Sequence, residues 1–360
     1  MEITKKIIKI EKQNWTDGLE NLRKGYRLFG PRRGEQFHLF QELAPGQSPD
    51  FDLQNTRLSP KALIYPQSEV MFRYSLDAKD PDPHILHEAE KDPTPGVVIG
   101  IRPCDAAAFG LVRRNFDSPE YQDPYWIRAY AATTLVGLAC DRPCGTCFCT
   151  TAGSGPYDET GLDLLLAEDE DHYLAKVLSA KGQTLLEAAG WQSAPDAADG
   201  VGQFEARKQH AEDKIVARVD TDALPSAAAA QLYDAPFWEE VAFACINCGT
   251  CTYACPTCWC FDIQDETYGT RGVRLRNWDS CMYPLFTLHG SGHNPRGTKV
   301  QRVRQRFMHK LKYYVDKYGN GIQCVGCGRC IRQCPVNIDI RKVCELMNGL
   351  ASEAQTCPAR

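Results

Sequence analysis

The sequence predicts a mixed α+β or α/β N-terminal domain at 1–195, followed by an α-helical C-terminal domain at 237–348. Three observations lead to this division. Apolar runs and a helical segment alternate through the first half, the stretch from about 196 to 236 is rich in Ala, Asp, Glu and Gln, and one cysteine pattern occurs twice after residue 244. The acidic stretch predicts a helical connection, and the last residues, 349–360, predict a loose tail. A length of 360 residues fits two or three domains.

The clearest signal in the N-terminal domain is the apolar run 97–101. This run follows a Pro-Gly turn and predicts a buried strand. Asp105 then predicts the N-cap of a helix over 106–115. A second apolar run at 133–139 predicts another strand, so the order strand, helix, strand indicates a parallel βαβ unit. Further strands are expected at 162–166 and 173–178, and a helix at 181–189.

The C-terminal domain is expected to be helical because residues 256–323 separate the two cysteine runs, far more than a compact two-cluster ferredoxin allows. A linker helix at 227–230 and a helix at 237–244 lead into the first run. Helical patterns at 300–314 and 338–348 follow. Each cysteine run is expected to begin a helix, which gives an α-helical ferredoxin-type domain.

Both runs have the form Cys-x2-Cys-x2-Cys-x3-Cys-Pro, which is the bacterial ferredoxin pattern for [4Fe-4S] clusters. The fourth cysteine of each run usually ligates the other cluster. The expected ligand sets are Cys245, Cys248, Cys251 and Cys334 for cluster 1, and Cys255, Cys324, Cys327 and Cys330 for cluster 2. Structural zinc also uses Cys-x2-Cys, but it needs neither the third cysteine nor the Cys-Pro ending in both copies.

A third group of cysteines lies in the N-terminal domain, where Cys104 and Cys140 are expected at the carboxyl ends of neighbouring strands. Together with Cys147 and Cys149 they predict a third cluster. A redox disulfide between Cys144 and Cys147, a zinc site, and buried free cysteines that bind no cofactor remain alternatives.

The remaining cysteines give weaker signals. Cys258, Cys260 and Cys281 are candidates for additional ligands, with core thiols beside the clusters as the alternative. Cys344 and Cys357 are interpreted as packing and tail residues.

A basic stretch precedes the second cysteine run. In this stretch Arg302, Arg306 and Lys310 share one face of the expected helix. These cations could raise the potentials of nearby anionic clusters or dock an acidic partner. An ordinary solvated helix face is the third interpretation.

Several function classes are disfavoured by what the sequence lacks. The net charge of −5 and the absence of an aromatic readout motif disfavour nucleic-acid binding. We expect neither a membrane span nor a secretory signal. No dinucleotide or P-loop motif is present, so we expect no nucleotide bound by this chain itself. The 18 cysteines favour a reducing, cytoplasmic compartment with metal-bound thiolates.

Five segments together resemble one protein family: IGIRPCDAAAF (99–109), GLAC and TCFCTTAGSGP (137–156), CINCGTCTYACPTCWCFD (245–262), RNWDSCMYPLFTLHGSGHNPR (276–296) and CVGCGRCIRQCPVNIDIRKV (324–343). The chain is similar to the iron-sulfur β subunits of cytoplasmic sulfhydrogenases and NAD(P)-linked [NiFe] hydrogenases. The same family includes the corresponding iron-sulfur component of anaerobic sulfite reductase. The resemblance covers roughly residues 25–345, and Cys144 falls where the family pattern does not require cysteine.

The resemblance implies an electron-transfer subunit without activity of its own. It would relay electrons between a catalytic subunit, with hydrogenase favoured, and a flavin/NAD(P)H subunit. It also implies roles for the four N-terminal cysteines. A sulfite reductase or heterodisulfide-reductase-linked complex is the alternative setting. An alternative of another class is a sulfur-compound reductase acting at the N-terminal cysteines, with Arg102 and Arg142 as anion binders.

Overall fold

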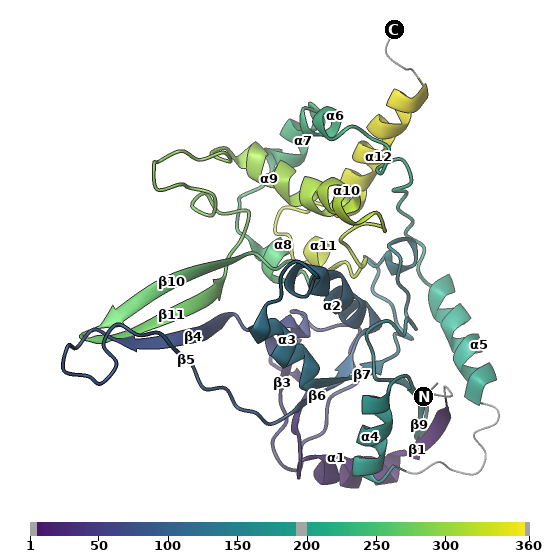
Figure 1. Ribbon diagram of the computed structural model, residues 1–360. Helices are drawn as coiled ribbons and strands as arrows, with labels where there is room; N and C mark the ends of the chain where they lie inside the picture. The colour runs from purple at the N-terminus through teal and green to yellow at the C-terminus, as the bar shows by residue number, and fades with distance from the viewer. Residues whose placement is uncertain (1–5, 192–199, 357–360) are drawn as a thin grey trace.

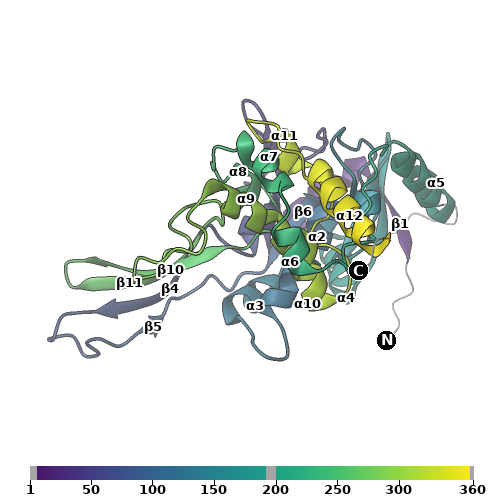
Figure 2. The same ribbon diagram turned by 90° about the horizontal axis from the view of Figure 1, so that it is seen from above.

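The computed structural model describes residues 6–191 and 200–356. A large sheet and its helices form the lower body in Figure 1, and the cysteine-rich helical part lies above it. A narrow four-stranded arm projects from the side of the molecule where the two parts meet, as Figure 2 shows from above.

The body is a seven-stranded mixed sheet with the order β1-β9-β8-β7-β6-β2-β3. Strands β2, β6, β7 and β8 run parallel, and β1, β3 and β9 pair antiparallel at the two sides. The strands are β1 (Ile7–Glu11), β2 (Arg27–Arg33), β3 (His38–Glu42), β6 (Gly96–Ile101), β7 (Thr133–Leu138), β8 (Leu164–Glu168) and β9 (His172–Val177). The strands predicted at 97–101, 133–139, 162–166 and 173–178 are therefore present, with the third shifted by two residues.

Helices cover both faces of this sheet because successive strand residues point to opposite sides. On one face, Val97 and Ile99 pack with α1 (Trp15–Leu22) and α4 (Ala180–Ala189). On the other face, α2 (Pro103–Phe116) and α3 (Pro124–Ala131) pack in a separate apolar cluster. The predicted helix at 181–189 is confirmed.

The β6-α2-β7 unit confirms the predicted parallel βαβ arrangement, but its helix begins earlier than expected. Arg102 is the N-cap residue of α2, and Pro103 occupies the first position of the helix. Proline suits that position because its fixed φ matches the helix and its missing N–H would have had no partner there. The prediction of Asp105 as the N-cap was therefore wrong; Asp105 lies within the first turn.

The cysteine-rich part is mostly helical, but it also contains a long hairpin that the sequence patterns did not predict. The hairpin pairs β10 (Phe261–Tyr268) with β11 (Arg271–Trp278). The helices are α6 (Ala229–Tyr233), α7 (Phe237–Phe243), α8 (Thr250–Tyr253), α9 (Lys299–Met308), α10 (Tyr314–Tyr318), α11 (Arg329–Arg332) and α12 (Ile340–Thr356). A π-helical turn at His309–Tyr313 joins α9 to α10. Since α12 continues to Thr356, the loose tail predicted from residue 349 was wrong for these residues.

The arm combines strands from both halves of the chain in the order β10-β11-β4-β5. β4 (Ser68–Ser75) pairs antiparallel with β11, and β5 (His87–Glu88) closes the opposite edge. At the base of the arm, Arg276 is buried and forms an ion pair with Glu69 at 2.6 Å. The arm therefore links the two parts of the chain by strand pairing as well as by charge.

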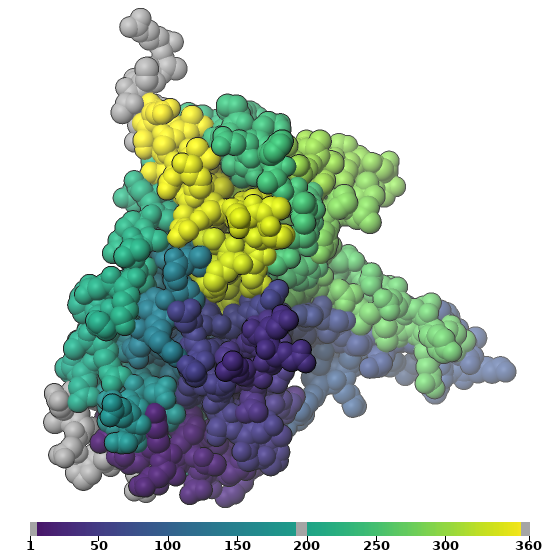
Figure 3. Space-filling view, turned by 180° about the vertical axis from the view of Figure 1, so that it is seen from behind, coloured from purple at the N-terminus to yellow at the C-terminus, as the bar shows by residue number. Residues whose placement is uncertain are grey.

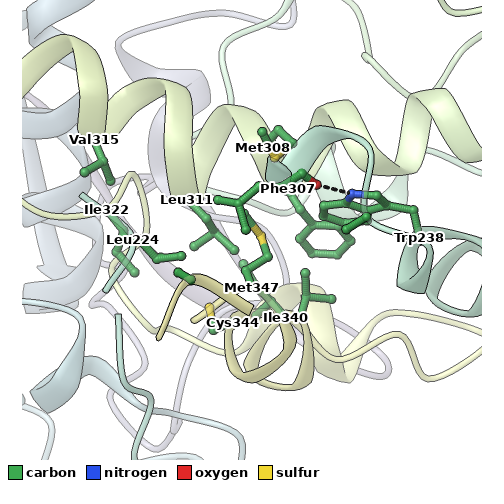
Figure 4. Close-up of a cluster of buried hydrophobic side chains, with 14 of the residues drawn as sticks. Leu224, Trp238, Phe307, Met308, Leu311, Val315, Ile322, Ile340, Cys344 and Met347 are labelled. Atoms are coloured by element: carbon green, nitrogen blue, oxygen red, sulfur yellow. Dashed lines mark hydrogen bonds between the residues drawn. The ribbon is translucent and has the colours of Figure 1, made fainter. Parts of the chain in front are cut away.

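The helical part has its own apolar core, shown in Figure 4. Trp238, Phe307, Leu311 and Met347 meet there from α7, α9, the π-helical turn and α12. The indole Nε1 of Trp238 donates a hydrogen bond of 2.7 Å to the carbonyl of Leu232. Helix α5 (Gly200–Asp213) connects this core to the sheet body.

Among the described residues, no helix is long and apolar enough to cross a membrane.

Candidate iron-sulfur sites

The first cysteine run forms a tight loop that ends in the single turn of α8. Asn247 and Gly249 have positive φ angles of 55° and 74°. A side chain at Gly249 would come within 2.9 Å of Tyr283 Oη, so glycine is needed there for two reasons. The loop brings Cys245, Cys248 and Cys251 to one cavity, and Cys334 reaches the same cavity from the second run.

The second run repeats this geometry around α11, with positive φ at Gly326 and Gly328. A second cavity is lined by Cys324, Cys327 and Cys330 together with Cys255 of the first run. The exchange of the fourth cysteine between the runs is thus the arrangement that the ferredoxin pattern predicts. Ligation of iron by these two sets stays a prediction.

The basic face predicted on one helix lies inside the protein. Arg302, Arg306 and Lys310 are all buried, with Arg306 only 4% exposed. Both the solvated-face and the docking-face interpretations were therefore wrong for these three residues. The helix packs against the cysteine loops, so its cations lie beside the thiols instead of facing solvent.

Arg306 lies between the first two cavities and lines both. Burial opposes the charge of its guanidinium, but the neighbouring Cys251 and Cys330 thiolates outweigh this and raise its pKa. Its Nε atom is buried without a hydrogen-bond partner. An unpaired buried cation is costly unless an anion accompanies it, and a thiolate-bound cluster is such an anion. The residues present therefore fit an iron-sulfur cluster on either side of Arg306.

Lys310 adds a second buried cation beside the second cavity. Its Nζ donates to Thr257 Oγ1 at 2.8 Å, and the adjacent thiolates, led by Cys255, outweigh burial and raise its pKa. Lys310 belongs to the π-helical turn, and such turns are frequent at functional sites.

Arg302 supports the first cavity through an amide. The side-chain oxygen of Asn247 is best oriented toward Arg302, where it accepts from Nε at 2.8 Å. In that orientation the amide nitrogen of Asn247 lies 3.3 Å from Cys245 Sγ and faces the sulfur. Hydrogen bonds to ligand sulfurs are one of the means by which proteins set cluster potentials.

A third cavity lies where β6 and β7 end. It is lined by all four cysteines of the predicted third set, Cys104, Cys140, Cys147 and Cys149. Cys144, which was not included in the predicted set, lines it too. A hydrogen bond from Cys147 lowers the pKa of the Cys144 thiol to about 6, while the same contact raises the pKa of Cys147. The Cys144-x2-Cys147 spacing was the signal available for including Cys144.

The third cavity adjoins the second through backbone contact. Cys327 lines both cavities, and its carbonyl accepts a hydrogen bond of 3.7 Å from Cys147 Sγ. Phe148 N donates to Gly326 O at 2.9 Å. A Cβ at Gly326 would lie 2.5 Å from Cys149 N, so only glycine permits this approach.

Charged groups fix the two parts of the chain around these cavities. Arg329 and Asp105 are fully buried and form a bidentate ion pair at 2.6 and 2.7 Å. Lys61 Nζ donates to the carbonyls of Cys255 and Cys258 at 3.0 and 2.9 Å. Burial lowers the pKa of Lys61. The cysteine loops are thus held from the N-terminal side as well.

Arg102 and Arg142 do not offer a free anion-binding site. The guanidinium of Arg102 is buried and donates to four backbone carbonyls, including Ala139 O at 2.6 Å. Arg142 is paired with Asp52 at 2.8 Å.

The weaker cysteine candidates lie outside the cavity linings, although Cys258 is hydrogen-bonded to Cys255 of the second cavity. Cys258, Cys260 and Cys281 do not line any of the three cavities. A hydrogen bond with Cys281 lowers the pKa of Cys260 to about 7. Cys344 is fully buried in the helical core, as its packing role predicts. Cys357 lies outside the described residues.

Single metal ions find no ready-made site in the described part of the chain, because no three His, Cys, Asp or Glu side chains there form a group that could hold one. A tetrahedral zinc site needs its ligands about 2.0–2.3 Å from one point. The cysteines instead surround cavities, which suits a larger group.

Comparison with known proteins agrees with this geometry. Residues 244–338 match the model of a 4Fe-4S dicluster domain. The chain is 29% identical over 349 residues to sulfhydrogenase 2 subunit beta of Pyrococcus furiosus, covering 95% of this chain and 99% of that protein. No solved structure matches. This protein is therefore an iron-sulfur electron-transfer chain with a mixed α/β N-terminal region and a ferredoxin-type dicluster domain, related along nearly its whole length to a sulfhydrogenase beta subunit.

Proposed function

We propose that this chain carries electrons one at a time through three [4Fe-4S] clusters. Clusters 1 and 2 are held by the two exchanged ferredoxin sets, and cluster 3 is held by Cys104, Cys140, Cys147 and Cys149, which all line the N-terminal cavity. Each cluster supplies a one-electron redox couple whose potential the surrounding protein tunes.

The observation that carries this proposal is that neighbouring cavities share lining residues. Arg306 lines the first and second cavities, and Cys327 lines the second and third. The shared residues support a linear order of clusters 1, 2 and 3. A chain with this order would accept an electron at one end and deliver it at the other.

The chain's own residues would tune the wire. Arg306 places a buried positive charge beside clusters 1 and 2, and Lys310 adds a second one beside cluster 2, which favours the more reduced, more negative state of each cluster. The third cavity has Arg102 in its lining, but its guanidinium donates to four backbone carbonyls, whose dipoles partly offset its positive field at the cavity. Cluster 3 would therefore have a lower reduction potential than clusters 1 and 2.

The proposed setting is a cytoplasmic complex that also contains a catalytic subunit and a flavin/NAD(P)H subunit. The relative named above is a sulfhydrogenase subunit, which favours a hydrogenase as the catalytic partner over a sulfite reductase. A sulfur-compound reductase at the N-terminal cysteines receives no support from Arg102 and Arg142, whose guanidinium groups are engaged elsewhere.

The test begins with anaerobic purification of the chain with its stoichiometric partners. Iron, acid-labile sulfide, nickel and sirohaem would be measured, and the reduced clusters counted by EPR spectroscopy. The proposal expects roughly 12 iron atoms per chain, together with nickel. Sirohaem without nickel would move the chain to a sulfite-reducing complex.

A matched pair of variants tests the ligand assignment. Cys248→Ser is expected to lose or convert cluster 1 and to stop electron transfer through the chain. Cys344→Ser changes a cysteine of the helical core that lines none of the three cavities, so all clusters should remain. Full electron transfer in the Cys248→Ser protein would refute the wire.

A further inference from the structure

Exposed apolar side chains lie on the segments that border one recess beside the first cavity. Phe243 and Ile246, at the end of α7 and in the following loop, are 83% and 63% exposed. Leu285 is 73% exposed in the 283–298 loop, and Ile263 is 47% exposed on β10. Figure 3 shows a hollow between the lobe that contains this loop and the projecting arm. We call this region the arm recess.

The arm recess lies over the site of cluster 1. Cys248 is the one exposed cysteine among the described residues. Tyr283, which begins the 283–298 loop, donates its hydroxyl to Cys248 O at 3.5 Å. At the other end of the loop, Lys299 Nζ donates to Phe243 O at 2.8 Å. Both ends of the 283–298 loop are thus attached at, or just before, the loop that carries the first three cysteines.

The arm side of the recess is an unpaired strand edge. All eight residues of β10 are exposed, and its only strand partner within the described residues is β11. In Figure 1, β10 is the strand of the arm nearest the 283–298 loop, and Figure 2 shows that loop above the arm. A long free edge with apolar residues is a template for pairing with another chain, and proteins usually cover or interrupt such edges.

The loop side carries positive charge. Arg296 and Lys299 lie in or next to the 283–298 loop, and the sequence has no Asp or Glu from residue 282 to residue 315. The part of a partner that faces this loop would therefore be neutral or acidic.

We propose that the arm recess docks a protein that carries its own redox centre and that adds an extended, partly apolar segment along β10. Main-chain hydrogen bonds to the free edge would supply affinity, and Phe243, Ile246 and Leu285 would supply apolar contact. The partner's redox centre would then face Cys248, where cluster 1 comes closest to solvent. This inference rests on the proposed electron relay and adds where one of its redox partners binds.

The test compares surface variants of the cluster-bearing chain, purified anaerobically with its partners from its own host. Ile246→Asp and Leu285→Asp should each reduce the bound amount of one stoichiometric, flavin- or iron-containing subunit by at least about ten-fold. Val201→Asp is the matched control, because Val201 is 60% exposed on α5, on the side of the molecule away from the arm. It should retain the partner.

Site-specific cross-linking provides the second measurement. A photoreactive p-benzoylphenylalanine placed at position 246 or at position 263 should label the same subunit, and that subunit should contain a flavin or iron. Labelling of different chains from the two positions would overturn the proposal. So would wild-type retention of the subunit by both Asp variants, or a wild-type chain that purifies without any partner.

Reduction of the chain by dithionite separates failure of this inference from failure of the relay. Dithionite needs no docking surface, so all variants should show the wild-type EPR signals if their clusters are intact. Loss of partner with intact, reducible clusters supports the arm recess. A wild-type chain without clusters would instead remove the proposed function.

Discussion

Replacing Gly326 with alanine tests whether the third cavity depends on its contact with the second cysteine run. Gly326 has φ of 62°, and a Cβ there would lie 2.5 Å from Cys149 N and 2.6 Å from Cys149 Cα. Those atoms belong to backbone and cannot rotate away. Since carbon contacts settle near 3.5 Å or more, the loop carrying Cys147 and Cys149 must shift by about 1 Å.

A shift of this size is large for a metal site. Ligand distances are held within about 0.2 Å in working sites, so a displacement of about 1 Å should prevent ligation by Cys147 and Cys149. The Gly326→Ala protein is therefore expected to lose cluster 3 and roughly a third of its iron. Iron analysis and EPR spectroscopy of the anaerobically purified protein would measure this.

Gly319→Ala is the matched control. Gly319 has φ of 67°, but a Cβ there would meet nothing within 4 Å. This variant incurs only the left-handed backbone cost of about 1–2 kcal/mol and should keep all its iron. If Gly326→Ala also keeps a full complement of iron and three EPR signals, the argument that this contact maintains the third site is wrong.

Three further predictions follow from buried groups. Asp105→Asn leaves Arg329 buried without its ion-pair partner and should lower the free energy of unfolding by about 3–5 kcal/mol. Glu42→Gln, at a solvent-exposed ion pair, should lower it by only about 0–1 kcal/mol. Anaerobic urea unfolding would compare the two variants, and equal losses would contradict the reasoning. Arg306→Gln removes a positive charge between two cluster sites and should lower their reduction potentials by on the order of tens of millivolts, as measured by EPR-monitored redox titration; unchanged or higher potentials would count against it. Burial raises the pKa of Cys344 to about 12, so this thiol stays protonated at pH 8 and should remain unlabelled by iodoacetamide in the folded protein, which mass spectrometry would detect.

Much of the fold could be predicted because the signals are local. The βαβ unit follows from apolar runs at 97–101 and 133–139, and these became β6 and β7. The helix between them was found, but its start was misplaced because Asp105 resembles a capping residue while Pro103 fixes the first turn. Asp105 instead forms a buried ion pair with Arg329, which is distant in the sequence, and no local pattern reveals this contact.

The site was predictable where spacing encodes it and not where tertiary packing does. The exchange of Cys255 and Cys334 between the runs follows from the ferredoxin pattern. The burial of Arg306 could not be read from a basic helical stretch, because periodicity alone does not say which face is inside. The β10–β11 hairpin was missed because β11 also pairs with β4, which lies about two hundred positions earlier in the chain. A local pattern does not reveal such a distant partner.

The contact between residues 146–149 and the second cysteine run also constrains how the protein is made. Thr146 and Gly328, which are hydrogen-bonded, are 182 positions apart. At synthesis rates of about 5–20 residues per second, the N-terminal thiols would leave the ribosome roughly 10–35 s before their covering loop. During that interval five cysteines intended for one cavity are open to oxidation or to the wrong metal. Iron delivery to the third site is therefore expected only after the second run has left the ribosome and folded against the N-terminal cysteines.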